Sequence, residues 1–172
     1  MGISIRDSQL QDMPGVQAIY ALEVLEGTAS FELEPPGLEE MLRRRQSVLD
    51  AGLPYLVATE GEGVAGYCYA SNYRSRPGYR YTLENSVYVA SWARRRGVGY
   101  SLIQALVERL EGGQWKQMVA VIGGSEHRAS IHLHEQAGFE HVGVLKSVGY
   151  KFDQWIDSVI MQRDISGVPT DT

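Results

Sequence analysis

The chain has 172 residues, a length that suits one domain with a single hydrophobic core. Its net charge of −5 argues against a nucleic-acid partner or an anionic membrane surface, because both require a basic protein face. The single cysteine, Cys68, excludes an internal disulfide, and no apolar leader or membrane-length apolar run is evident, so we expect a cytoplasmic protein.

The first half of the sequence mixes helical and extended patterns. Helices are indicated by apolar residues at three- and four-residue spacing, and strands by two-residue alternation. Capping residues and glycines set the expected ends. The predicted elements are a strand at residues 3–5, a helix between Asp12 and Gly27, a helix between Gly37 and Gly52, and a hairpin of strands at residues 55–59 and 64–73.

The second half predicts a strand over residues 80–89, a helix over 98–111, a strand over 118–122, a short helix closed by Gly138, and strands over 139–145 and 155–161. A strand, a crossing helix and another strand imply one parallel pair. We therefore expect an α+β fold with a mixed, mostly antiparallel seven-stranded sheet and about four flanking helices. Residues 1–165 would form this single domain, and residues 166–172 a flexible tail.

Residues 94–99, Arg-Arg-Arg-Gly-Val-Gly, join the strand at 80–89 to the following helix. A helix begins with unpaired backbone N–H groups, and no Ser, Thr, Asp or Asn is available here to cap them. Glycines let a ligand approach the backbone and arginines share its charge, so the loop predicts a phosphate site. Neither a dinucleotide fingerprint nor a Walker loop fits. An arginine-rich turn without a ligand is the alternative.

The pattern Arg-x-x-Gly-x-Gly, formed by Arg94, Gly97 and Gly99, resembles the acetyl-CoA diphosphate loop of the GNAT family of N-acetyltransferases. The run Ala129–Phe139 is similar to a second hallmark of that family, a short helix ending in Gly-Phe. Further segments look like the phosphinothricin and methionine sulfoximine N-acetyltransferase subfamily, namely Thr82–Val89, Val119–Gly123, Leu133–Glu135 and Val148–Asp157. The resemblance runs from about Ile3 to Asp164, and implies the GNAT fold, acetyl-CoA as co-substrate and no metal.

Amide formation from an amine and a thioester requires a base, a donor for the oxyanion and a proton for the leaving thiolate. The resemblance places the general base at Glu84, for which the alternative is a strand-edge glutamate in a salt bridge. His134 stands where many family members have a tyrosine proton donor, and it could equally be a substrate contact or a solvent-facing histidine. Cys68 is interpreted as a small core residue, so direct attack in a ternary complex is preferred over a covalent intermediate.

The resemblance also implies that the end of the strand and the arginine loop hold the cofactor. The oxyanion donor would be a backbone N–H near Val89, on a strand that family members splay from its parallel neighbour. Family members commonly bind the pantetheine with an asparagine before the last helix, and His127 is the best replacement in this chain. The expected cofactor-binding residues are Val87, Tyr88, Val89, Arg94, Arg95, Arg96, Gly97, Val98, Gly99, Tyr100, Ser101 and His127.

For the acceptor, the resemblance implies a small amino acid whose side chain ends in a tetrahedral polar group, such as a phosphinate, sulfoximine or sulfone. Guanidinium groups bind such oxygens bidentately, although exposed loop arginines often bind nothing. The expected substrate-binding residues are Phe31, Arg74, Gly78, Tyr79 and Arg80.

The leading functional hypothesis is therefore an N-acetyltransferase that moves acetyl from acetyl-CoA to the α-amino group of a small amino acid or analogue. One alternative is a GNAT enzyme for another amine, such as a polyamine, an aminoglycoside or a protein N-terminus. The other is a non-catalytic acyl-CoA sensor. The expected partners are a small-molecule acceptor and a second copy of the chain, with Trp155 and the late strands a plausible dimer interface.

Overall fold

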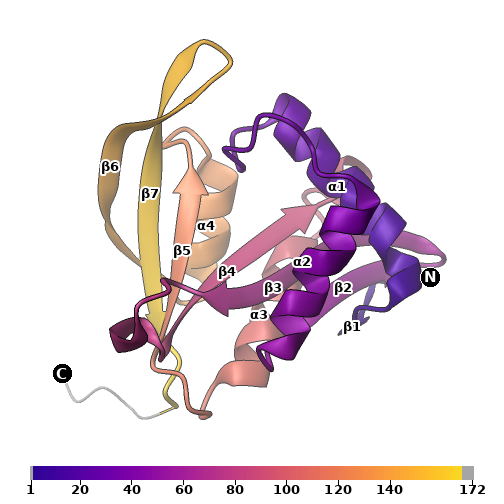
Figure 1. Cartoon of the computed structure of the whole chain (residues 1–172), viewed down its shortest axis with the longest axis horizontal. Coiled ribbons are helices and arrows are strands. Elements are labelled where there is room, and N and C mark those ends of the chain that lie inside the picture. The colour runs from indigo at the N-terminus through magenta and orange to yellow at the C-terminus, as the bar shows by residue number, and fades with distance from the viewer. Residues whose placement is uncertain (1, 168–172) are drawn as a thin grey trace.

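Seven strands form one sheet in the order β1-β2-β3-β4-β5-β7-β6 in the computed structural model, which describes residues 2–167 (Figure 1). Neighbouring strands are antiparallel except for β4 and β5, which run parallel as the strand–helix–strand order predicts. The predicted α+β fold is confirmed. The strands are β1 (Ser4–Asp7), β2 (Tyr55–Glu60), β3 (Gly63–Asn72), β4 (Thr82–Val89), β5 (Gln117–Gly123), β6 (Glu140–Lys151) and β7 (Gln154–Asp164).

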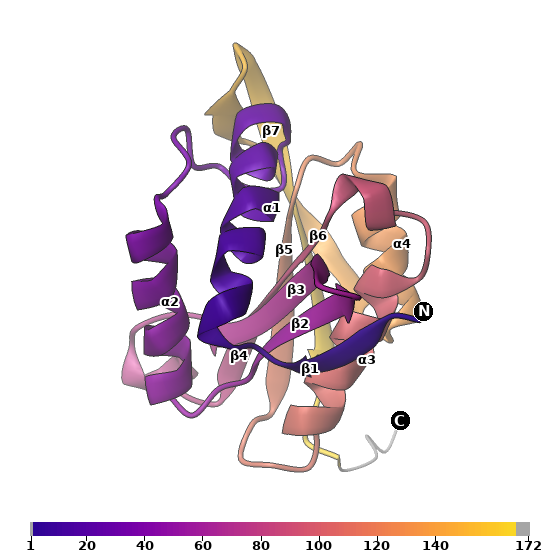
Figure 2. The same ribbon diagram turned by 90° about the vertical axis from the view of Figure 1, so that its right-hand side faces the viewer.

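Helices cover both faces of the sheet, with α1 and α2 on one side and α3 and α4 on the other (Figure 2). The apolar stripe predicted for α3 lies against the sheet, where Leu102, Ile103 and Leu106 are fully buried. The helices are α1 (Met13–Glu26), α2 (Leu38–Asp50), α3 (Val98–Leu110) and α4 (Arg128–Gln136), with short 3₁₀ turns η1 (Leu10–Asp12), η2 (Pro77–Tyr79) and η3 (Ser91–Ala93). None of the helices within residues 2–167 is long and apolar enough to cross a membrane.

Asp12 stands at the N-cap position of α1 as predicted, but its side chain makes no capping bond to α1, because Asp12 is also the last residue of the turn η1. Its carboxylate accepts the backbone N–H of Gln9 at 2.7 Å, which caps η1. It also forms a two-armed ion pair with Arg6, at 2.7 and 2.8 Å. This pairing lowers the pKa of Asp12, so we expect it to stabilise the fold above the usual aspartate pKa and to be lost on acidification.

The parallel strands β4 and β5 pair over only part of their length. Residues 82–85 pair with residues 117–120, and beyond that point the two strands separate. β4 stays paired with β3 as far as Val89, while β5 stays paired with β7 as far as Gly123. The sheet therefore opens into a wedge at its centre, visible in Figure 1 as the divergence of β4 from β5.

The β6–β7 hairpin is longer than predicted and projects beyond the rest of the sheet (Figures 1 and 2). Its turn residues, Phe152 and Asp153, both have left-handed backbone (φ 53° and 56°), as the tightest hairpin turns require. Two register irregularities in β6 break the two-residue alternation, which explains why the sequence pattern ended the strand early. At the predicted tail, Ser166 bonds Asp164, whereas residues 168–172 lie outside the described part.

Candidate active site

The start of α3 is open, as its sequence predicts. Gly97 precedes the helix with φ 78°, a left-handed conformation that favours glycine, and no side chain caps the helix. Gly99 faces α4 so closely that an added Cβ would lie 2.4 Å from a methyl group of Leu133. A larger residue at this position would have to displace the side chain of Leu133, and the first N–H groups of α3 remain free of side-chain caps.

The three arginines of the loop have different surroundings. Arg94 donates to Glu23 of α1 at 2.5 Å, and Arg96 forms a two-armed ion pair with Glu60 of β2 at 2.8 and 2.9 Å. Within residues 2–167, Arg95 is in none of the ion pairs found. The guanidinium of Arg95 is therefore available to bind an anion. Arg94 and Arg96 could bind one only by adding it to, or replacing, the carboxylates of Glu23 and Glu60.

A cavity of about 680 Å³ begins at this helix start and runs toward α4 along the part of β4 that has separated from β5. We call it the mouth cavity. Two of the predicted cofactor residues, Arg96 and Ser101, do not line it. The predicted residues that do line it are Val87, Tyr88, Val89, Arg94, Arg95, Gly97, Val98, Gly99, Tyr100 and His127.

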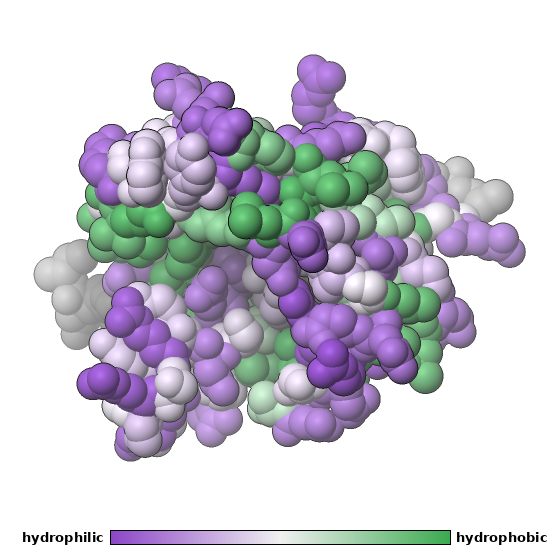
Figure 3. Space-filling view, turned by 45° about the horizontal axis from the view of Figure 1, so that its top comes forward, coloured by the Kyte–Doolittle hydropathy of each residue, from purple (hydrophilic) through white to green (hydrophobic). Residues whose placement is uncertain are grey.

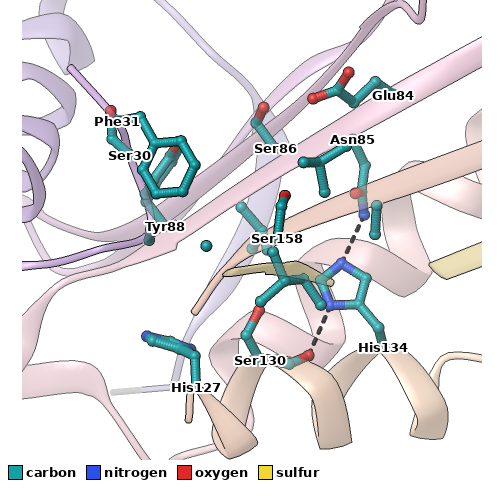
Figure 4. Close-up of a pocket in the computed structure, with 16 residues that line it drawn as sticks. Ser30, Phe31, Glu84, Asn85, Ser86, Tyr88, His127, Ser130, His134 and Ser158 are labelled. Atoms are coloured by element: carbon teal, nitrogen blue, oxygen red, sulfur yellow. Dashed lines mark hydrogen bonds between the residues drawn. The ribbon is translucent and has the colours of Figure 1, made fainter. Parts of the chain in front are cut away.

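A second cavity, the splay cavity, occupies the wedge between β4 and β5 and adjoins the first (Figure 4). Three segments far apart in the sequence meet there, because Glu84 lies on β4, Phe31 between α1 and α2, and His127 and His134 at the start and near the end of α4. Both predicted catalytic side chains thus lie at one cavity. The two cavities share part of their walls, since both are lined by Ala29, Val87, Tyr88, His127 and Ser130.

Glu84 is half-buried and has no hydrogen-bond or ion-pair partner within the described residues. The predicted alternative, a glutamate in a salt bridge, is therefore not what the structure shows. Burial raises the pKa of Glu84, because the cavity solvates its charge poorly. A carboxylate with a raised pKa and no internal partner is suited to accept a proton from a bound ammonium group.

His134 is buried, at 3% exposure, so the alternative of a solvent-facing histidine is excluded. Its Nδ1 lies 2.7 Å from the carbonyl oxygen of Ser130, which can only accept, and therefore Nδ1 carries a proton. Burial lowers the pKa of His134, so its neutral form is favoured. In that form Nε2 accepts an N–H from Asn85, 3.0 Å away (Figure 4). In the free protein His134 is a fully bonded, neutral imidazole.

Asn85 was missed by the sequence analysis. It is buried on β4, at the last position that pairs with β5, and it lines the splay cavity. Leu83 and Asn85 lie on the same face of the strand and are both buried. The sequence contained a signal for this, because Asn85 lies two residues from the apolar Leu83 in a predicted strand and should therefore face the core with it. A buried amide needs a hydrogen-bond partner, which would have pointed to a polar contact.

His127 lies where the two cavities meet, and its Nδ1 is buried without a hydrogen-bond partner in the described structure. Such an atom costs free energy unless a ligand bonds to it. This orphan nitrogen fits the place predicted for a pantetheine contact.

The predicted acceptor residues are not all brought together. Phe31 lines the splay cavity, but Arg74, Gly78, Tyr79 and Arg80 lie on the turn before β4 and line neither cavity. Arg74 packs over the rings of Tyr73 and Tyr79 in a separate surface depression. The guanidinium of Arg80 packs over Tyr81 instead.

Cys68 is completely buried in β3 and lines neither cavity. Burial raises the pKa of its thiol, which disfavours the nucleophilic thiolate. Its interpretation as a core residue agrees with this environment. Within residues 2–167, no cluster of side chains could hold a metal ion.

Residues 5–160 match a family model described as an acetyltransferase (GNAT) domain. A phosphinothricin N-acetyltransferase from Alcaligenes faecalis is 50% identical over 167 residues, which cover 97% of this chain and 85% of the relative. An L-methionine sulfoximine/L-methionine sulfone acetyltransferase from Pseudomonas paraeruginosa is 41% identical, with 96% of each chain covered. The crystal structure of a GNAT superfamily phosphinothricin acetyltransferase from Sinorhizobium meliloti in complex with AcCoA matches with a TM-score of 0.91 and 38% identity, covering 100% of this chain and 93% of that one.

Proposed function

The chain belongs to the GNAT family of acetyltransferases, and from that premise we propose that its acceptor is the α-amino group of a small amino acid or amino-acid analogue. Its co-substrate is acetyl-CoA. The relatives named above act on phosphinothricin and on methionine sulfoximine or sulfone. Amino acids of this kind, with a tetrahedral polar group on the side chain, are the acceptors that we propose.

One observation carries the catalytic part of the proposal: the partnerless carboxylate of Glu84 lies in a cavity that adjoins the open start of α3. The diphosphate of acetyl-CoA suits the uncapped N–H groups of α3 together with Arg95. The orphan Nδ1 of His127 suits a polar group of the pantetheine. A thioester held by these contacts would reach the splay cavity, where Glu84 is.

Glu84 then removes a proton from the acceptor's ammonium group, and the freed amine attacks the thioester carbonyl carbon directly. A backbone N–H near Val89, at the end of β4 that has separated from β5, donates to the developing oxyanion. As the new C–N bond forms, the C–S bond breaks and the electron pair leaves on sulfur. We place His134 on the leaving-group side, where it relays the second proton of the nitrogen to the thiolate. Asn85 must release Nε2 for this relay.

Phe31 supplies an apolar wall for the acceptor, beside Ser30 and Ser86. The turn before β4 does not reach this cavity within one copy of the chain, and it carries the other expected acceptor residues, Arg74, Gly78, Tyr79 and Arg80. Their proposed role in binding the acceptor's anionic groups therefore depends on a second copy or on movement of their turn.

A second copy is also favoured by the surface. The β6–β7 hairpin exposes large apolar side chains, namely Val142, Leu145, Val148, Tyr150, Phe152 and Trp155. Figure 3 shows that hydrophobic residues gather in patches on the side of the molecule that it draws. We propose that this face forms a homodimer. Light scattering should give twice the mass of one chain, and Trp155→Lys should halve it.

We also infer a cytoplasmic location, since acetyl-CoA is available there and the one cysteine is a free, buried thiol. Cell fractionation tests this point.

A thiol-release assay tests the activity itself. Acetyl-CoA is combined with methionine sulfone, methionine sulfoximine, phosphinothricin, spermidine or a short peptide, and free thiol is followed over time. We expect release with the three amino acids and little with the other two. Faster release with spermidine or the peptide would replace the proposed acceptor. Binding of acetyl-CoA without release in the presence of any acceptor would favour a sensor.

A further inference from the structure

Lys151 lies near the end of β6 and is almost completely buried, at 3% exposure. Its Nζ donates two hydrogen bonds, both of 2.8 Å, to the backbone carbonyl oxygens of Gly27 and Ser30. The ring of Phe152 lies 5.0 Å from the same nitrogen. Lys151 lines neither cavity and contacts none of the proposed reacting groups.

Both carbonyl groups belong to the loop between α1 and α2, residues 27–37, which we call the roof loop. Three consecutive residues of this loop, Ala29, Ser30 and Phe31, line the splay cavity. On the α1 side, the hydroxyl groups of Tyr20 and Ser30 are hydrogen-bonded at 2.8 Å. The roof loop is thus tied to α1 on one side and to the β6–β7 hairpin on the other, across the open wedge of the sheet.

Further contacts fix the loop to the end of β5 and to the hairpin. Thr28 donates its hydroxyl to the carbonyl of Gly123 at 3.2 Å. The ring of Phe31 lies against the backbone of Gly149, so closely that a Cβ added to Gly149 would be 2.6 Å from the ring. These contacts place Phe31 over the cavity that contains Glu84.

An ammonium group is costly to bury, and within the described residues Lys151 has no bonded carboxylate to compensate that cost. Burial lowers its pKa, against the more distant attraction of Glu23 and Glu32. The two hydrogen bonds that Lys151 donates to carbonyl oxygens of the roof loop offset part of this cost and connect the loop to the hairpin. Without Lys151, both carbonyl groups would lose their partner, and the loop would lose its polar tie to the hairpin.

We propose that Lys151 is a positioning residue that latches the roof loop to the β6–β7 hairpin and so holds Phe31 and Ser30 as the wall against which the acceptor binds. The inference rests on the proposed function insofar as the wall serves an amino-acid acceptor. The latch should affect the acceptor more than acetyl-CoA, because Ala29, Ser30 and Phe31 all line the splay cavity, whereas Ala29 alone among the roof-loop residues also lines the mouth cavity.

Lys151→Met tests the latch, because it keeps much of the buried stem and removes the ammonium group. Lys116→Met is the matched control, since it removes the same charge from a half-exposed side chain at the start of β5. For Lys151→Met we expect faster backbone hydrogen exchange in residues 27–37, and a KM for methionine sulfone raised about tenfold with kcat within about threefold. The Kd for acetyl-CoA, measured by calorimetry, should change much less than this KM, because Ala29 is the one roof-loop residue that lines the mouth cavity. Lys116→Met should match the wild type in all three.

Unchanged exchange in residues 27–37 would overturn the latch, and so would an equal loss of acetyl-CoA affinity. If Lys151→Met does not fold, Lys151→Gln decides, because it keeps a polar head group but its shorter, neutral amide cannot bond both carbonyl oxygens. The same faster exchange and raised KM are then expected, and wild-type behaviour would refute the proposal. If the wild type acetylates no amino acid in the panel, the proposed acceptor fails, and hydrogen exchange alone decides the latch.

Discussion

The mouth cavity takes its anion-binding groups from one short segment, residues 94–99 without Arg96, whereas the splay cavity takes its polar groups from β4, α4, the loop before α4 and the roof loop. The first is a local structure: a glycine-opened helix start with arginines beside it. The second exists only because two parallel strands separate after four paired residues on each. Anion binding should therefore tolerate changes elsewhere in the fold, while catalysis should be sensitive to the contacts that hold distant segments together.

Glu84→Gln should have the largest effect, because it removes the only proposed base of the splay cavity. We expect kcat/KM at neutral pH to fall about 10²- to 10⁴-fold, the usual contribution of a general base. Burial raises the pKa of Glu84, and the base must be ionised to accept a proton. The wild-type rate should therefore increase as the pH rises through the pKa of Glu84. The rate of the variant should not show this increase, and should rise only as the pH approaches the pKa of the acceptor's own amine. Glu62→Gln, at an exposed turn, is the control. A variant with the wild-type profile would remove Glu84 from the mechanism.

Asn85→Leu should destabilise the protein, because Nε2 of His134 would lose its donor inside the core. An unsatisfied buried acceptor costs about 2 kcal/mol in the free energy of unfolding. Urea denaturation measures this, with Asn72→Leu at the exposed end of β3 as control, for which about 0.5 kcal/mol or less is expected. Equal stabilities for the two variants would show that the Asn85–His134 bond does not hold α4 to β4.

Arg94→Ala should act on the mouth cavity alone. We expect acetyl-CoA binding to weaken by about 1.4 kcal/mol, or about tenfold in Kd, as one charge-assisted bond to the diphosphate is lost. The apparent KM for the acceptor at saturating acetyl-CoA should stay within about twofold. Calorimetry and steady-state kinetics separate the two quantities. Equal affinity for acetyl-CoA would mean that the backbone of α3 and Arg95 hold the anion without Arg94.

Glu23→Gln should have the smallest effect, and in the opposite direction. Glu23 holds Arg94 at 2.5 Å in the free protein and so competes with a phosphate for the same guanidinium. Because Arg94 is largely exposed, we expect only about a two- to fourfold tighter Kd for acetyl-CoA, and less at high salt. The gain should vanish when Arg94→Ala is also present. Weaker binding in Glu23→Gln would show that the ion pair orders Arg94 for the ligand.

Much of the fold was predictable because its signals are local. Two-residue alternation, three- and four-residue spacing and glycine positions gave seven strands and four helices, and strand–helix–strand order gave the parallel pair. Where a local signal was broken, prediction was poorer: the irregular β6 was cut short, and the side chain of Asp12 bonds back to η1 rather than to α1, because the sequence does not separate η1 from α1.

The sequence by itself determined the open helix start, because the groups that make it are covalent neighbours and their backbone preferences need no tertiary contact. It also marked Glu84 and His134, through a resemblance to a family. Only the tertiary structure decided which polar groups share a cavity. It placed Asn85 within hydrogen-bonding distance of His134, and it placed Phe31 in the loop that Lys151 bonds. It also kept Arg74 and Arg80 out of the splay cavity. Such pairings depend on where strands separate and loops cross, and residue spacing along the chain carries no record of those distances.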